Sequence, residues 1–362
     1  MTDASTPRAG CGCGPVDMHT HVVPADFPAY LGSRKGVPWP SMVPAAAPCH
    51  RHVVISGEVY RTVSHQCWDP AVRQADMDAM GVGVQVLSPM PELLSYWLAP
   101  EDGSAMCRFL NESVARLVQS DPARFVGLGA VPLQSVDAAV AELEHAVRVL
   151  GMAGVEIGSN IDGVPIGHPR FAPFFEAAAA LDAAVFVHAL RPAGMDRLVG
   201  PPQLEQVLAF PGEVGLAAAS MITGGTLARC PTLRIAFSHG GGSLPVLLPR
   251  LQHGFLTVPQ LRDQMQGRSP LEAARGLWFD DLVYDAPAIA NLLRVYGDTQ
   301  VMIGTDYPFA IMDREPLARL DALGLDAAAI ERLRSGNALR WLGQRAAVTA
   351  PTGTRPGEPA PS

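Results

Sequence analysis

The feature that most constrains the fold is a repeated alternation between short apolar runs and longer helical patterns. The runs that read as β-strands are VDMH (16–19), VGVQVLS (82–88), RFVGLGA (124–130), AGVEIG (153–158), AVFVH (184–188), LRIAFSH (233–239), LWFDDLV (277–283) and QVMIGTD (300–306). Two clear helices are predicted at 171–182 and 213–230. Near-continuous apolar strands separated by helices are typical of a parallel sheet covered on both faces. Eight such units predict an α/β fold, a (β/α)₈ TIM barrel.

One segment breaks this alternation. Residues 22–69, rich in Pro, Gly, His and aromatic side chains, lie between the first strand and its helix. We interpret them as an insertion over the barrel mouth, with a hairpin at 52–63, because long loops of this kind are commonly functional lids. The barrel is predicted to span 15–345. Residues 1–14 are expected to be a flexible leader, and the Pro- and Thr-rich residues 346–362 a disordered tail.

Composition excludes several classes of function. The net charge of −8 argues against nucleic acid as a partner, because phosphate binding needs clustered Lys and Arg. No apolar run reaches the roughly 18 residues of a membrane span, so no membrane partner is expected. Six cysteines without CxxC spacing favour a reduced, cytoplasmic location. Cys11 and Cys13 could bind metal or pair, although a loose leader is the favoured interpretation.

Three histidines and one aspartate stand at the ends of predicted strands, and a fourth histidine follows two residues after the first. His19 and His21 end strand one, where residues i and i+2 point to the same face. His188, His239 and Asp306 end strands five, six and eight. All carboxyl ends of barrel strands meet at one mouth, which holds the active site. Neutral imidazoles with a carboxylate suit zinc, so the joint pattern predicts a metal centre although an HxH pair alone is weak.

The remaining polar candidates carry less information. Asp17 faces opposite to the HxH pair and either orients a metal ligand or caps a turn. His168 is expected to begin a helix before Pro169. The other histidines are expected to be structural or exposed: His50, His52, His65, His145 and His253.

Several motifs together resemble one known family. They are VDMHTHVVP, CWDPAVRQADMDAMGVGVQVLS, RFVGLGAVPLQ, GVEIG, SHGGGSLP, GTDYPF and SGNALRWLG, spread over residues 15 to 343. In these motifs the chain resembles the amidohydrolase-type decarboxylases, above all the branch that acts on 2-amino-3-carboxymuconate 6-semialdehyde. SHGGG together with GTDYP is a specific pair, whereas HxH is shared across the superfamily.

The resemblance implies a set of site residues. It implies one Zn²⁺ per subunit, bound by His19, His21, His188 and Asp306. It also implies that His239 is the acid–base residue beside the metal, and that Asp306 takes part in catalysis. Arg61 and Arg250 match arginines that bind the substrate carboxylates, and in that family the second arginine comes from the partner subunit of a homodimer.

The chain departs from the family on one side of the mouth. After the strand-five histidine the family has Pro-Trp-Asp-Met, whereas here His188 is followed by Ala189, Leu190, Arg191 and Pro192. The Trp-rich segment that follows in the family is replaced around 201–210 by PPQLEQVLAF, which has no Trp. Arg191 is either a new anion contact or a surface residue, the latter being slightly favoured. The exact substrate is therefore open.

The functional hypothesis is zinc-dependent, non-oxidative decarboxylation of a small carboxylate. Candidate substrates are 2-amino-3-carboxymuconate semialdehyde and a hydroxy- or aminobenzoate, since a conjugated substrate takes up the electrons that CO₂ leaves behind. No GxGxxG loop opens a helix, so no redox cofactor is implied. A metal-dependent hydrolase or hydratase on the same site is the alternative. A non-catalytic metal-dependent scaffold is the rival from another class, and the complete ligand and base set argues against it.

Overall fold

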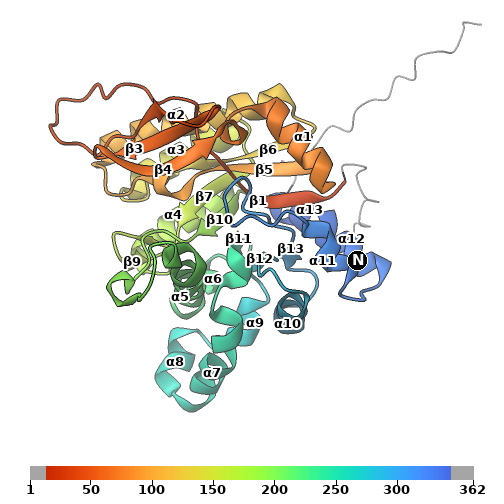
Figure 1. Ribbon diagram of the computed structural model, residues 1–362. Helices are drawn as coiled ribbons and strands as arrows, with labels where there is room; N and C mark the ends of the chain where they lie inside the picture. The colour runs from red at the N-terminus through yellow and green to blue at the C-terminus, as the bar shows by residue number, and fades with distance from the viewer. Residues whose placement is uncertain (1–13, 344–362) are drawn as a thin grey trace, which may run out of the picture.

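The computed structural model describes residues 14–343, and its centre is a parallel eight-stranded sheet (Figure 1). The strands, in sheet order, are β1 (Val16–Val22), β5 (Val84–Pro89), β6 (Phe125–Ala130), β7 (Gly154–Gly158), β10 (Ala184–His188), β11 (Arg234–Phe237), β12 (Trp278–Asp280) and β13 (Val301–Met302). Each of the eight predicted strands is confirmed, and sheet order follows sequence order, as in a barrel. The predicted leader, tail, Cys11 and Cys13 lie, apart from Gly14, outside the described residues.

The sheet curls until its first and last strands meet. Beyond β13 the chain continues along β1, and the Met18 amide donates to the Ile303 carbonyl at 2.9 Å. The Asp306 amide donates to the His19 carbonyl at 2.9 Å, and the His21 amide to the Tyr307 carbonyl at 2.7 Å. These bonds bring Asp306 beside His19 and His21, although Asp306 is far from both in sequence.

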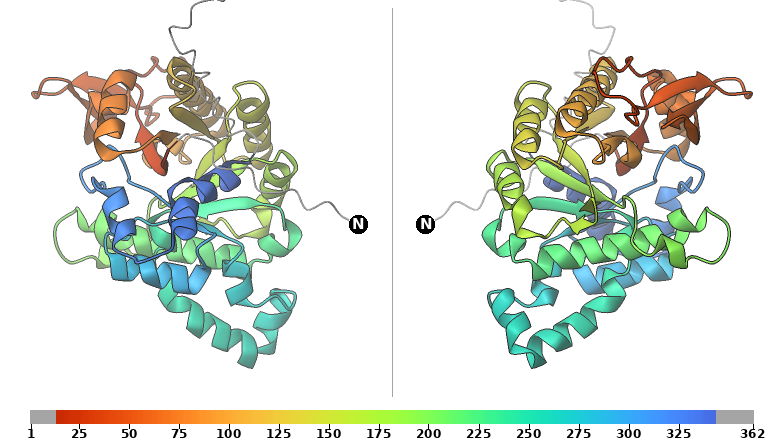
Figure 2. Two further views of the ribbon diagram at one scale, coloured as in Figure 1. Left: turned by 90° about the vertical axis from the view of Figure 1, so that its right-hand side faces the viewer. Right: turned by 90° about the vertical axis from the view of Figure 1, so that its left-hand side faces the viewer.

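Helices form the outer layer (Figures 1 and 2). The longer ones are α1 (Pro70–Met80), α2 (Pro100–Ser120), α3 (Val136–Arg148), α4 (Ala172–Ala180), α5 (Phe210–Thr223), α7 (Leu244–Thr257) and α10 (Ala286–Tyr296). The shorter ones are α6 (Thr226–Arg229), α8 (Pro259–Gln264), α9 (Pro270–Ala274), α11 (Pro316–Asp321), α12 (Ala327–Glu331) and α13 (Asn337–Leu342). Helix 171–182 is confirmed as α4. The helix predicted at 213–230 is divided into α5 and α6, because Gly225 has a left-handed backbone with φ of 74°.

One end of the barrel is closed by an apolar cluster. Trp341 and Leu342 of α13 are fully buried and pack with Val16, Val84 and Phe186, which lie inside the barrel. The side chains that fill this end leave the opposite end, at the carboxyl termini of the strands, as the open mouth. Within residues 14–343, no helix combines the length and apolarity needed to cross a bilayer.

The segment between β1 and α1 forms a small antiparallel sheet. It consists of β2 (Ser41–Pro44), β3 (His50–Ile55) and β4 (Glu58–Ser64), and Figure 1 shows β3 and β4 next to α1 and α2. The hairpin predicted at 52–63 is present as β3 and β4, whereas β2 was not predicted. Val53 and Val63 anchor the sheet in the main core. The interpretation of this segment as a lid stays a prediction. Two further short strands, β8 (Asn160–Ile161) and β9 (Val164–Pro165), follow β7.

Candidate metal centre and its pocket

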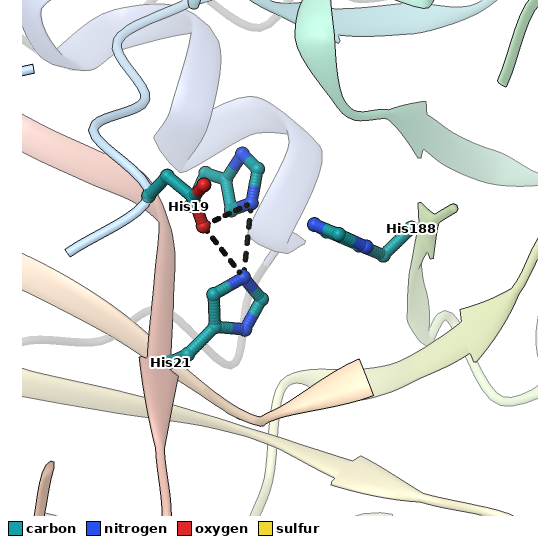
Figure 3. A group of neighbouring side chains, drawn as sticks. His19, His21 and His188 are labelled. Carbon is teal, nitrogen blue, oxygen red and sulfur yellow. Dashed lines mark hydrogen bonds and ion pairs between the residues drawn. The ribbon is translucent and has the colours of Figure 1, made fainter. Parts of the chain in front are cut away.

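The four residues predicted to hold metal converge at the barrel mouth. His19, His21, His188 and Asp306 are buried, and one ligand atom from each lies within 4.8 Å of the others. The Nε2 atoms of His19 and His21 are 3.1 Å apart, and Asp306 Oδ1 is 3.1 Å from His21 Nε2. Figure 3 shows His19 and His21 extending from one strand, with His188 approaching from the other side. The sequence prediction that they gather at one point is confirmed.

The donor atoms fit a divalent cation. Two imidazole nitrogens and a carboxylate oxygen point at one another, and His188 Nε2 is buried without a hydrogen bond among the described residues. A buried polar atom without a partner is costly unless an ion or water satisfies it. Three imidazoles with one carboxylate are a donor set that binds zinc and related transition metals. A metal site is therefore indicated here.

Electrostatics favour the metal-binding form at His21, His188 and Asp306. At His19, burial alone would lower the pKa, but the hydrogen bond to Asp280 raises it. Burial lowers the pKa of His21 and, more strongly, that of His188, where neighbouring imidazoles add to the effect, so both rings favour the neutral state. Burial alone would raise the pKa of Asp306, but the hydrogen bond from His21 and the nearby imidazoles hold it below its ordinary value. Neutral imidazoles and an ionised carboxylate are the forms that ligate metal.

Asp280, at the end of β12, supports the metal ligands and was missed by the sequence reasoning. Its Oδ2 is 2.7 Å from His19 Nδ1, and it also accepts from the amides of His239 (2.9 Å) and Gly240 (2.7 Å). A carboxylate on the outer nitrogen of a ligating imidazole sets its tautomer and orientation. The strand-end rule that found the other residues applied equally to the Asp pair of LWFDDLV, but it does not tell which of the two faces a ligand.

His239 lies beside the four-residue group without joining it. Its ring centroid is 5.1 Å from that of His188 and 5.5 Å from that of His19. Burial and the neighbouring His19 lower the pKa of His239 to about 4, so the ring is neutral near pH 7. His239 has a φ of 55°, which is unusual for a residue other than glycine. Gly242 follows with φ of 57°, and a Cβ there would collide with the Pro211 carbonyl oxygen. The tight backbone predicted for the glycine run is present.

A narrow pocket opens directly on the metal centre. It is lined by Arg61, Pro91, Glu92, His188, Gln206, Phe210, Asp306, Phe309 and Ile311. Arg61 comes from β4, and its guanidinium lies over the Phe309 ring at 4.4 Å. Burial would lower the pKa of Arg61, but nearby Glu92 and Asp306 raise it. A larger hollow, lined by Trp68 and Phe109 among others, shares no lining residue with this pocket.

The other two arginines lie elsewhere. Arg250 is exposed on α7 and does not line the pocket of its own chain. Arg191 is also exposed, with its guanidinium 3.6 Å from the centroid of the Trp97 ring, and it is absent from the pocket lining as well. The favoured prediction of a surface position for Arg191 matches this placement.

Asp17 and His168 have structural positions. Asp17 accepts from the Thr305 amide at 3.1 Å and hydroxyl at 2.6 Å, and so ties β1 to the segment that carries Asp306. Its contact with the HxH pair is the His19 backbone amide, at 3.3 Å, rather than an imidazole. His168 accepts from the Arg170 amide at the start of a short helical turn (Pro169–Phe171), as predicted.

A parallel barrel with imidazoles and a carboxylate gathered at its open end defines a metal-binding barrel enzyme. The chain belongs to the amidohydrolase family, whose sequence pattern matches residues 16–344. It is 35% identical over 331 residues to the 2-amino-3-carboxymuconate-6-semialdehyde decarboxylase of Dictyostelium discoideum, covering 91% of each chain.

Two solved structures have folds similar to that of this chain. The apo IDCase of Metarhizium anisopliae superposes with a TM-score of 0.76 at 21% identity, covering 91% of this chain and 96% of that one. The 5-carboxyvanillate decarboxylase of Novosphingobium aromaticivorans, complexed with manganese and 4-hydroxy-3-methoxy-5-nitrobenzoic acid, gives a TM-score of 0.69 at 26% identity. That match covers 77% of this chain and 81% of the other. These relatives and structural neighbours include metal-dependent decarboxylases.

Proposed function

We propose that this protein is a zinc-dependent, non-oxidative decarboxylase of a small conjugated or aromatic carboxylate. The observation that carries the proposal is the buried cluster of His19, His21, His188 and Asp306 opening on a pocket that holds Arg61. The decarboxylase relative that matches along nearly the whole chain supports the reaction type. Candidate substrates are 2-amino-3-carboxymuconate semialdehyde and a hydroxy- or aminobenzoate.

Zinc is the proposed metal because three of the four ligands are imidazoles. Imidazole suits zinc, whereas manganese prefers carboxylate and water oxygens. One structural relative has been crystallised with manganese, so the metal must be measured in this protein. A divalent ion bound here would supply Lewis-acid chemistry.

Residues of the chain are proposed to bind the substrate, transfer the proton, exclude water and hold the ligands in position. Arg61 is proposed to bind the substrate carboxylate through its planar fork of donors. His239, whose ring lies beside those of His188 and His19, is proposed to exchange a proton with the substrate; burial lowers its pKa to about 4, so the ring is neutral until it takes up that proton. Phe210 and Phe309 form apolar walls that exclude water from the reacting group. Asp280 holds the His19 ring and the His239 backbone in place.

Arg250 is proposed to serve the pocket of a partner subunit in a homodimer. It lies on an exposed face of α7, one helical turn beyond Val246, which is 78% exposed. Figures 1 and 2 show α7 and α8 projecting away from the barrel, where a second copy can reach them. A cytoplasmic location is proposed as well; Cys49, Cys67, Cys107 and Cys230, the cysteines of the described region, are free thiols.

The reaction is tested by product analysis. Purified, zinc-loaded protein is incubated with the candidate semialdehyde, hydroxybenzoates and aminobenzoates, and products are followed by mass spectrometry. A decarboxylase yields products that have lost the mass of CO₂. Products that have gained the mass of water, or ester, lactone or amide cleavage alone, would establish the hydrolase or hydratase alternative.

The dimer is tested by mixing two inactive variants, Arg250→Ala and His239→Ala. A mixed dimer contains one complete site if Arg250 crosses to the partner, so random reassociation restores about a quarter of wild-type activity. No recovery on mixing, with dimers shown by light scattering, would place Arg250 outside the partner's site.

A further inference from the structure

The pocket above the metal centre carries two opposite charges on different walls. Arg61 comes from β4 of the insertion, whereas Glu92 comes from the short helical turn Pro91–Leu94 that follows β5. Both line the same pocket as His188 and Asp306, and Glu92 is only 8% exposed. A carboxylate this buried needs partners, because an ionised group taken out of water is costly when left unpaired.

Arg61 and Glu92 do not satisfy each other. Within residues 14–343, no nitrogen of Arg61 lies within 4.0 Å of a carboxylate oxygen of Glu92. They are nevertheless close enough that the Glu92 carboxylate raises the pKa of Arg61. Two opposite charges that line one pocket without pairing, one of them buried, leave room for a ligand with complementary groups at both ends.

Tyr60, the residue before Arg61, lies close enough to Glu92 for the two groups to interact electrostatically. Burial and the adjacent Glu92 charge raise the pKa of Tyr60, so its hydroxyl stays protonated. An ionised carboxylate has about four lone-pair positions, so one phenol cannot saturate it. The free acceptor capacity of Glu92 therefore remains on the pocket side.

The other walls restrict what can enter. Pro91, Phe210, Phe309 and Ile311 are apolar, and Gln206 is the remaining uncharged polar residue of the lining. The two aromatic side chains of the lining, Phe210 and Phe309, suit contact with a planar ring or a short conjugated chain. A substrate with carboxylates alone would meet the negative charge of Glu92, whereas a hydroxyl or amino group on the substrate would be attracted to it.

We propose that Glu92 is a specificity-determining residue that accepts a hydrogen bond from a hydroxyl or amino substituent of the substrate while Arg61 binds the carboxylate. The inference rests on the proposed function, because it assumes that a carboxylate occupies this pocket. It names the substrate class as a single-ring or short conjugated carboxylate with a hydrogen-bond donor. Glu92 lies in the segment SPMPELLSYW, where the sequence pattern gave no reason to single it out.

The test measures binding of benzoate and of 2-, 3- and 4-hydroxybenzoate to the zinc-loaded protein by calorimetry. The best hydroxybenzoate is expected to bind about tenfold to a hundredfold more tightly than benzoate, as for a hydrogen bond to a charged acceptor. Glu92→Leu should reduce this ratio to near one. Glu92→Gln keeps the shape and an uncharged acceptor, so the ratio should fall by about threefold or more. Glu144→Gln removes the same charge from an exposed position on α3, outside the pocket lining, and should leave the ratio unchanged.

The binding ratios distinguish recognition by Glu92 from recognition by another group. A ratio that survives in both Glu92 variants would overturn the inference, since the hydroxyl would then be recognised elsewhere, for example by the metal. Equal binding of benzoate and hydroxybenzoates to the wild-type protein would also overturn it, while leaving the proposed function intact. If none of these benzoates binds, the inference fails, whereas the proposed function is judged separately by the loss of CO₂ in the product analysis. Should Glu92→Leu not fold, Glu92→Gln decides alone.

Discussion

The metal centre and the pocket wall above it are built in different ways. His19, His188 and Asp280 stand in or at the end of barrel strands, inside a ladder of backbone hydrogen bonds. The wall is supplied by connections: Arg61 by the insertion and Glu92 by the turn after β5, with Gln206 and Phe309 also outside the barrel strands. Strands hold a side chain in place, whereas loops tolerate change in sequence.

The metal centre carries the motifs that this chain shares with the family, whereas part of the pocket wall departs from the family pattern. The motifs that carry the family resemblance include the HxH pair, SHGGG and GTDYP, all at the metal centre. The departures, at 189–192 and 201–210, follow β10, and the second contributes Gln206 and Phe210 to the wall. We infer that the reaction type depends on the strand ends and the substrate choice depends on the loops.

The largest effect should follow from removing the carboxylate of the metal centre. Asp306→Ala is expected to abolish metal binding and turnover together, by about a thousandfold or more, because the site loses its anionic ligand. Metal content by mass spectrometry and turnover are measured side by side, with exposed Asp321→Ala as the control. A full equivalent of zinc in Asp306→Ala would contradict the assignment.

Removing the proposed proton-transfer residue should spare the metal. His239→Asn is expected to lower kcat by about a hundredfold to ten-thousandfold, the range for loss of a general acid–base group, with zinc retained. His253→Asn, at an exposed position on α7, is the control and should behave like the wild type. Unchanged kcat in His239→Asn would remove this residue from the reaction.

Replacing Asp280 tests whether its contact with the His19 ring contributes to metal binding. Asp280→Asn should weaken zinc binding by about tenfold to a hundredfold, because His19 loses the carboxylate that orients it. Asp281→Asn is a matched control: Asp281 is also buried, but it accepts from the Gly304 amide instead of from a ligand. Equal zinc affinity in both variants, measured by chelator competition, would assign Asp280 to folding alone.

The pocket wall should affect substrate binding more than turnover. Arg61→Met is expected to raise KM by about tenfold to a hundredfold, because a buried carboxylate contact is lost. Arg191→Met removes the same charge from the Trp97 stack outside the pocket, so KM should change by less than about threefold. Similar KM values for the two variants would mean that the pocket is not where the carboxylate binds.

The smallest expected effect is that of moderate acid on metal binding. Three imidazoles with the ordinary pKa of about 6.5 would together weaken zinc binding by about a thousandfold between pH 7.5 and 5.5, because protons compete with the metal. The pKa of His21 is lowered and that of His188 is lowered well below the ordinary value, so protons compete less at these two rings. Burial alone would lower the pKa of His19, but its hydrogen bond to Asp280 raises it, so this ring is the one most open to protonation. Zinc affinity should therefore fall by less than about a thousandfold. A thousandfold loss in chelator competition would show that burial does not protect these ligands.

The strands and the metal ligands could be predicted from the sequence because both follow a local rule. Apolar runs mark buried parallel strands, and in a barrel every strand end reaches the same mouth, so His19 and Asp306 could be placed together without coordinates. The hairpin at 52–63 was predictable for the same reason, through its alternating pattern around Gly57.

Other features needed the tertiary structure because they depend on direction and distance between segments that are remote in sequence. Asp280 and Asp281 are neighbours of the same type, and packing alone decides that the first faces His19 while the second accepts from Gly304. Nothing in the sequence distinguishes Glu92 from other acidic residues. Only the fold places it in the lining of the same pocket as Arg61. A sequence pattern records which residues an element exposes on each face; only the closed barrel decides which of them meet.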